Sequence, residues 1–128
     1  MRGFIAGAFD LLHPGHIYTL RECKMRCDKL VVGLHVNPSL ERPSKNKPVE
    51  TVFERFIRLA ACKYVDEIVP YETEEDLLNI LHTLNLDIRF LDVEYSQLPE
   101  RITGKDIVPI VFIEREHSWS SRRLRKRI

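Results

Sequence analysis

The fold is decided by the stretch Gly7-Ala8-Phe9-Asp10-Leu11-Leu12-His13-Pro14-Gly15-His16. It follows a short apolar run, Gly3 to Ala8, that has the length of a buried strand, and helical apolar spacing begins at Ile17. Pro14 suits the first turn of a helix, and Gly15 allows a ligand to approach the backbone closely. We therefore predict a strand followed by a tight turn and a helix.

The same turn places two histidines, His13 and His16, at the start of the expected helix. Free N–H groups and the positive end of the dipole attract anions there, and side chains three residues apart line one side. We predict a phosphate site in which both imidazoles donate hydrogen bonds to oxygens that gain charge during phosphoryl or nucleotidyl transfer. The alternatives are ordinary structural histidines and a metal site that includes Asp10. The sequence has neither the His-Glu-x-x-His pattern of zinc enzymes nor a Cys/His cluster, so we predict no metal ligand.

These residues resemble the HxGH nucleotidyltransferases, and among them the small glycerol-3-phosphate cytidylyltransferases. The resemblance runs through Gly7 to His16, Arg55 with the segment Lys63 to Glu67, and Arg115 to Leu124. It implies transfer of a cytidylyl group from CTP to a small phosphorylated acceptor, glycerol 3-phosphate, with release of pyrophosphate and formation of CDP-glycerol. It also implies Mg²⁺ bound with the triphosphate, and a homodimer.

Two other functions remain open from the sequence. One is cytidylyl or adenylyl transfer to another phosphorylated polyol, sugar, choline or ethanolamine. The other is a module that binds a nucleotide or RNA without turnover. We disfavour the binding module because a site that only binds has no need for the histidine pair.

The resemblance further implies roles for individual residues. His13 and His16 stabilise charge on the α-phosphate, and a lysine of the loop Asn37 to Pro48 holds the outer phosphates; Lys47 is favoured over Lys45. Acceptor-binding residues are Asp10, Arg55 and Glu94. Ser120 and Ser121 stand at a predicted helix start, where hydroxyls and N–H groups hold phosphate oxygens or simply cap the helix. The nucleotide-binding residues are Gly7, Ala8, Phe9, Gly15, Lys45, Arg115, Ser120, Ser121 and Arg122.

The sequence departs from the family pattern near the expected base and acceptor pockets. Ala8 replaces a hydroxyl residue, and Asp92 and Val93 differ from the glycerol-3-phosphate enzymes. Arg122 replaces a threonine of the C-terminal motif. These changes bear on the identity of the substrate more than on the type of reaction.

The length and composition are those of one globular domain, which we expect to be cytoplasmic. The chain has 128 residues, a formal net charge of +1 and three cysteines, an odd set that fits a reducing compartment better than disulfides. Five of the last seven residues are basic, but a helix C-terminus explains them as well as nucleic acid does, so we consider nucleic acid unlikely as a partner. No stretch is apolar enough for a signal sequence or a membrane span, so we expect no membrane partner.

Alternating apolar segments predict a single Rossmann-like α/β domain over residues 1–128, with a five-stranded parallel sheet and helices on both faces. Ligands then bind beyond the carboxyl ends of the strands. In the second helix, we expect the buried face to be the apolar one: Phe53, Phe56, Ile57, Ala60 and Ala61. The expected strands are Gly3 to Ala8, Lys29 to Val36, Glu67 to Val69, Asp87 to Leu91 and Ile107 to Ile113. The expected helices are Gly15 to Lys24, Thr51 to Lys63, Thr73 to Leu84 and Ser118 to Ile128.

Overall fold

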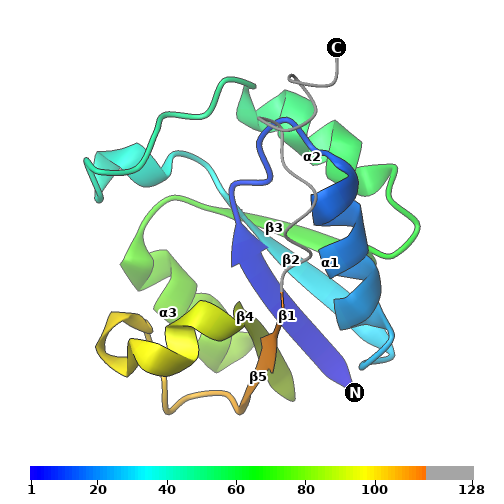
Figure 1. Ribbon diagram of the computed structural model, residues 1–128, viewed down its shortest axis with the longest axis vertical. Coiled ribbons are helices and arrows are strands. Elements are labelled where there is room, and N and C mark those ends of the chain that lie inside the picture. Colours follow the sequence, from blue (N-terminus) through cyan, green and yellow to red (C-terminus); the bar gives the residue numbers. More distant parts are fainter. Residues whose placement is uncertain (115–128) are drawn as a thin grey trace.

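Strand β1 (Arg2–Gly7) lies at the centre of a five-stranded parallel sheet with the order β3-β2-β1-β4-β5 (Figure 1). The structure is a computed structural model that describes residues 1–114. It confirms the predicted parallel α/β sheet. The other strands are β2 (Lys29–His35), β3 (Glu67–Tyr71), β4 (Ile88–Asp92) and β5 (Ile110–Ile113).

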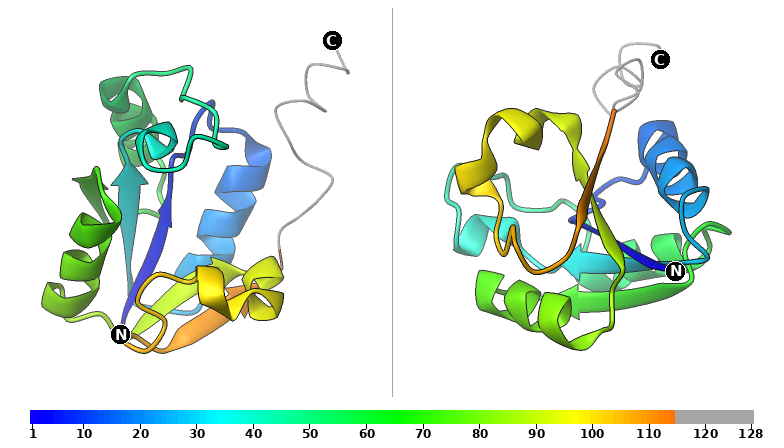
Figure 2. Two further views of the ribbon diagram at one scale, coloured as in Figure 1. Left: turned by 90° about the vertical axis from the view of Figure 1, so that its left-hand side faces the viewer. Right: turned by 90° about the horizontal axis from the view of Figure 1, so that it is seen from below.

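Helices cover both faces of the sheet, as predicted. Helices α1 (Pro14–Lys24) and α2 (Val52–Ala60) pack on one face, and α3 (Glu74–Thr83) packs on the other (Figures 1 and 2). Both faces of β2 are therefore enclosed, which explains its nearly continuous apolar sequence. Within residues 1–114, no helix is long and apolar enough to cross a membrane.

Several boundaries differ from the predicted ones. Strand β5 begins at Ile110, three residues later than expected, because a turn at Gly104, where φ is +65°, has the N–H of Ile107 donating to the carbonyl of Gly104. The two polar loops contain short 3₁₀ helices: η1 (Pro38–Leu40), η2 (Val93–Gln97) and η3 (Pro99–Arg101). The predicted closing helix, Ser118 to Ile128, lies outside the described residues.

The orientation predicted for α2 is wrong. The expected apolar face is open to solvent, with Phe53 69% and Ile57 50% exposed. Leu59 and Arg55 are the buried residues of this helix. The start predicted at Thr51 is confirmed by a capping box, in which the N–H of Glu54 donates to Thr51 Oγ1 at 3.1 Å and the N–H of Thr51 donates to Glu54 Oε1 at 2.9 Å. The local start signal was therefore correct, and the choice of buried face was not.

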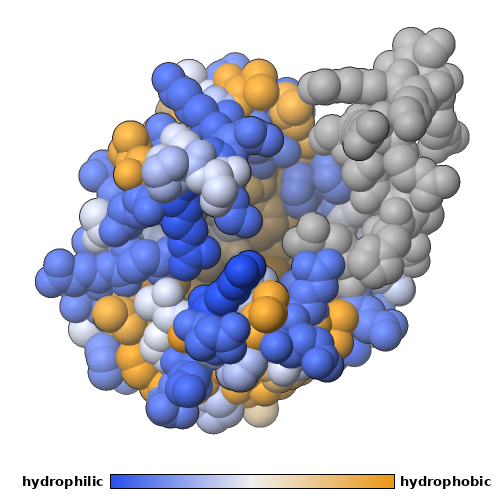
Figure 3. Space-filling model, turned by 60° about the vertical axis from the view of Figure 1, so that its left-hand side comes forward, coloured by the Kyte–Doolittle hydropathy of each residue, from blue (hydrophilic) through white to orange (hydrophobic). Residues whose placement is uncertain are grey.

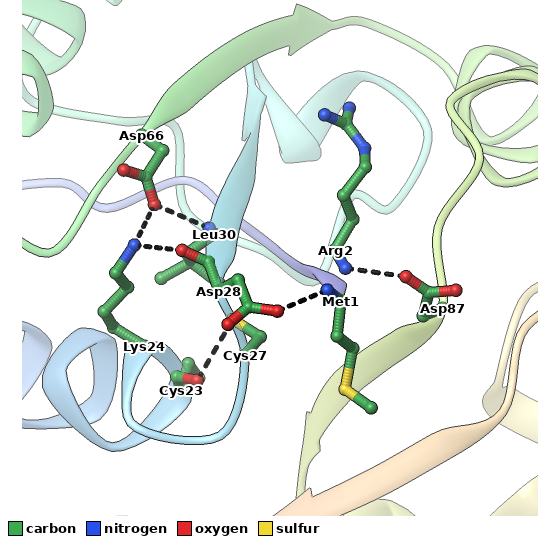
Figure 4. Close-up of polar contacts among 9 residues, drawn as sticks. All are labelled: Met1, Arg2, Cys23, Lys24, Cys27, Asp28, Leu30, Asp66 and Asp87. Atoms are coloured by element: carbon green, nitrogen blue, oxygen red, sulfur yellow. Dashed lines mark hydrogen bonds and ion pairs between the residues drawn. The ribbon is translucent and has the colours of Figure 1, made fainter.

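Hydrogen bonds and ion pairs join the amino ends of the strands to neighbouring segments (Figure 4). Asp66 accepts hydrogen bonds from the N–H of Leu30 at 2.8 Å and from Lys24 Nζ at 2.5 Å, which joins α1, β2 and the segment before β3. Asp87 accepts from the N–H of Arg2 at 2.7 Å. The amino edge of the sheet is thus closed by its own side chains, and the site lies at the opposite edge.

Candidate active site

A pocket opens where β1 and β4 separate. β1 pairs with β2 at six positions, up to Gly7 with Leu34, but with β4 at only two, Gly3 with Ile88 and Phe4 with Arg89. The strand order reverses between these two strands, which is where ligands bind in open α/β sheets. The pocket has a volume of about 550 Å³. Figure 3 shows a hollow with an apolar floor and a hydrophilic rim.

The paired histidines form the cap of α1 and part of the pocket wall. The Nδ1 of His13 accepts from the N–H of Gly15 at 3.0 Å, and the Nδ1 of His16 accepts from the N–H of His13 at 3.2 Å. The rings stack with centroids 3.9 Å apart. Because each Nδ1 is an acceptor, each neutral ring carries its proton on Nε2. The helix cap thereby fixes two Nε2–H donors on one side of the turn, as a phosphate site requires.

The turn before α1 is strained and held by acidic side chains. Phe9 and Leu11 have φ values of +49° and +50°, which cost about 1–3 kcal/mol each in residues other than glycine. Asp10 holds the turn in place by accepting from the N–H groups of Val49 at 2.8 Å and Glu50 at 3.0 Å. The N–H of Leu11 donates to Glu50 Oε1 at 2.8 Å. The turn is therefore locked to the segment that precedes α2.

Glu50 was missed in the sequence because no motif surrounds it. Its side chain is 7% exposed, and Oε2 pairs with Arg58 Nε at 2.6 Å. The two carboxylate oxygens thus bind the turn and α2 respectively. A glutamate before a capping threonine carries no pattern that predicts this contact.

Arg55 occupies a different position from the one expected of an acceptor-binding residue. It is 2% exposed and does not line the pocket. Burial lowers the pKa of its guanidinium. Arg55 ties together the ends of β1 and β2 and the start of α2, so the structure gives it a positioning role. Its donors reach four backbone carbonyl oxygens, those of Glu50 (3.2 Å), Ala8 (3.0 Å), His35 (2.7 Å) and Val36 (2.5 Å).

The other predicted residues divide into three groups. Of the two candidate loop lysines, Lys45 lines the pocket and Lys47 does not, and Glu94 also lies away from the wall. Four candidates, Arg115, Ser120, Ser121 and Arg122, lie outside the described residues. The residues that line the pocket as predicted are Gly7, Ala8, Phe9, Asp10, His13, Gly15 and His16.

The described part of the chain contains neither a cluster of metal ligands nor a thiol placed for reaction. Within residues 1–114, no group of three His, Cys, Asp or Glu side chains is arranged to hold a metal ion. Cys23 is buried in the core, and burial raises the pKa of its thiol. Cys27 Sγ donates to the carbonyl of Cys23 at 3.4 Å. These thiols serve packing.

Comparison with known proteins settles the family. The family model described as cytidylyltransferase-like matches residues 4–127. This chain belongs to the cytidylyltransferase-like family. This family assignment agrees with the class of enzyme, a nucleotidyltransferase, that the sequence predicts.

Members of this family with similar sequences are longer than this chain. The bifunctional protein HldE of Caulobacter sp. (strain K31) is 36% identical over 107 residues, which are 83% of this chain and 21% of that protein. The HldE of Nitrobacter hamburgensis is 32% identical over 131 residues, covering 98% of this chain and 26% of the relative. This chain therefore spans about a fifth to a quarter of the length of these relatives.

A solved structure also resembles this cytidylyltransferase-like chain. The lipopolysaccharide core biosynthesis protein from Thermoplasma volcanium GSS1 superposes with a TM-score of 0.72 at 29% sequence identity. The match covers 90% of this chain and 97% of that protein. The similarity therefore extends over one whole α/β unit.

The pocket also reaches the α3 face of the sheet, through several residues that the sequence analysis did not name. Arg42 pairs with Glu74 at 2.9 Å, and the rings of His35 and Tyr71 stack with centroids 4.6 Å apart. Burial lowers the pKa of His35, which keeps its imidazole neutral, and raises the pKa of Tyr71. One signal was present in the sequence: Arg89 interrupts the apolar run of β4, and an arginine inside a buried strand is rare unless it has a partner.

Proposed function

We propose that this enzyme transfers the nucleotidyl group of CTP to the phosphate of a small phosphorylated polyol or sugar. An acceptor phosphate oxygen attacks the α-phosphorus, the bond from that phosphorus to the β-bridging oxygen breaks, and pyrophosphate leaves. The observation that carries the proposal is the histidine cap, in which two imidazoles at a helix N-terminus use Nδ1 as an acceptor and form part of the pocket wall. No protein nucleophile is needed, because the acceptor supplies the attacking oxygen.

Catalysis then consists of positioning and stabilisation of charge. His13 and His16 donate to oxygens of the α-phosphate, where charge develops, and the N–H groups at the start of α1 add to the same field. Lys45 lines the pocket and is the better placed of the two lysines for the outer phosphates. Mg²⁺ enters with the triphosphate and offsets its charge. Asp10 acts indirectly here, since its carboxylate oxygens hold the turn.

The acceptor has two candidates. The family resemblance supports glycerol 3-phosphate, which would give CDP-glycerol. The solved relative is described as a lipopolysaccharide core biosynthesis protein, and this description supports a phosphorylated sugar. The pocket has room beyond the histidines on the α3 face, which also favours an acceptor larger than glycerol 3-phosphate.

Pyrophosphate release tests the proposal directly. The full chain is assayed with each common nucleoside triphosphate, Mg²⁺ and a panel that contains glycerol 3-phosphate and several sugar phosphates. We expect release with CTP and one acceptor, and loss of release in His16→Ala. Release with ATP alone would replace the nucleotide and retain the mechanism. Nucleotide binding without release, for any pair, would favour the non-catalytic module.

We also propose that the enzyme is a cytoplasmic homodimer. The family resemblance supports both statements. Analytical ultracentrifugation of the full chain tests the dimer, and a monomer at micromolar concentration would refute it.

A further inference from the structure

Arg89 lies at the base of the pocket. It forms the second and last β1–β4 pair, with Phe4, and the two strands separate beyond this level. Phe4 packs in the core beneath α3, so the side chain of Arg89, its neighbour in the sheet, is on that face too. Arg89 is 3% exposed and lines the pocket.

The described residues leave one hydrogen-bond donor of this arginine without a partner. One N–H of its guanidinium donates to the carbonyl of Thr103 at 2.6 Å, whereas Nε has no hydrogen-bond partner among the described residues. Within the same residues, no carboxylate forms an ion pair with it. Glu74 is engaged elsewhere, because Arg42 pairs with its Oε1 at 2.9 Å and Thr103 Oγ1 donates to its Oε2 at 2.9 Å. A buried cation without a paired anion is costly, and this one faces a cavity.

A second buried polar atom lies along the same wall. His35 is 8% exposed, and its Nε2 has no partner in residues 1–114. Its ring stacks on Tyr71, whose phenol interacts with the charge of Arg89. The basic residues Arg42, Lys45 and Arg101 also line the pocket, together with the acids Asp10, Glu74 and Asp92. Arg89 and His35 therefore offer this part of the pocket two buried polar atoms without partners among the described residues, which suits a negatively charged and hydroxylated group.

We propose that Arg89 binds an oxyanion, a carboxylate or a second phosphate, at the end of the acceptor opposite its reacting phosphate. His35 Nε2 bonds to a hydroxyl of the acceptor beside that anion. The reacting phosphate lies near the histidine turn after Gly7. The backbone of Arg89 is level with Phe4, three residues before Gly7 and about 10 Å along the strand, and for this reason we assign its oxyanion to the other end of the acceptor. The inference rests on the proposed function, and it makes Arg89 a specificity-determining residue.

Binding of three matched probes tests the proposal without requiring turnover. Glucose 1-phosphate, glucuronic acid 1-phosphate and glucose 1,6-bisphosphate share one ring and differ at the sixth carbon, which carries a hydroxyl, a carboxylate or a phosphate. Calorimetric titration of the full chain at fixed ionic strength should show roughly tenfold tighter binding of at least one anionic probe than of glucose 1-phosphate. The tighter of the two anionic probes identifies the oxyanion.

Variants test whether Arg89 causes the tighter binding of the anionic probes. Arg89→Gln should abolish the preference, while Arg26→Gln, which removes an exposed arginine outside the pocket, should retain it. Arg89→Lys keeps a charge without the planar fork and should show a reduced preference, which provides a second test if the glutamine variant does not fold. Equal binding of the three probes by the native protein, binding of none, or a preference that survives in Arg89→Gln would overturn the proposal. Absence of pyrophosphate release would refute the proposed function and leave this preference measurable.

Discussion

Asp10 has two possible roles: it binds the acceptor, as the family resemblance implies, or it holds the turn of the site in place, as its hydrogen bonds indicate. Its carboxylate accepts two backbone N–H groups, from Val49 at 2.8 Å and Glu50 at 3.0 Å. A hydrogen bond to a charged group contributes about 1.5–3 kcal/mol, and solvent near the exposed Val49 favours the lower end. Asp10→Ala removes both bonds and should lower the free energy of unfolding by about 3 kcal/mol.

Asp10→Asn refines the same test. An amide oxygen can accept from one N–H, but the amide nitrogen then faces the other donor, so this variant should lose about half of that energy or more. Asp92→Asn is the matched control, because Asp92 also lines the pocket and accepts a backbone N–H, that of Glu94 at 3.0 Å. We expect it to change the stability by less than about 0.5 kcal/mol, because asparagine caps a helix about as well as aspartate does.

Two assays on the same proteins decide between the roles. Urea unfolding followed by circular dichroism gives the stability, and pyrophosphate release gives kcat and the KM for each substrate. We expect Asp10→Asn to lower both stability and kcat, because the strained turn no longer holds the histidines in place. A stability within about 0.5 kcal/mol of the native protein, with a rise confined to the KM of the acceptor, would refute this reasoning and restore direct acceptor binding.

The remaining predictions concern the histidines, the buried arginine and the orientation of α2. His16→Ala should lower kcat by about 10²–10³-fold in the pyrophosphate assay, because one donor to the developing charge is lost. Arg55→Lys should cost more than about 3 kcal/mol in urea unfolding, since one ammonium does not span four carbonyl oxygens. Leu59→Ala should cost about 2–5 kcal/mol, whereas Phe53→Ala, at an exposed position, should stay within about 0.5 kcal/mol. Burial holds the pKa of His35 below its ordinary value, so the unfolded chain takes up a proton first as the pH falls. Stability should therefore decline below about pH 6.5, and the decline should be shallower in His35→Gln.

Contacts between residues that are close in the chain could be predicted from the sequence. The capping boxes Thr51 with Glu54 and Thr73 with Asp76 join residues three apart, and both are present. The histidine turn belongs to the same class, since its contacts span two or three residues. The parallel sheet followed from the alternation of apolar segments, each of which is itself local.

The buried face of α2 was not readable, because long-range contacts decide it. Helical spacing favoured Phe53 and Ile57, but Arg55 is separated by 47 residues from Ala8 and by 20 from His35, whose carbonyl oxygens it binds. Those carbonyls lie at strand ends that no periodicity marks. Hydrogen bonds to the carbonyl oxygens at the strand ends therefore outweighed burial of the larger apolar side chains. The spacing of apolar residues along a helix contains no information about such hydrogen bonds.

The acidic residues of the turn pose an electrostatic problem that the fold has to solve. Asp10 and Glu50 lie beside the place where we propose that the triphosphate binds, and two unpaired carboxylates there would repel it. Each is stabilised by protein donors: Asp10 accepts two N–H groups, and Glu50 accepts the N–H of Leu11 and pairs with Arg58. The carboxylates thus hold the strained turn without cancelling the positive field at the start of α1. Arg89 is the opposite case, a charge that the described residues leave unpaired, and this difference is why we place substrate recognition there.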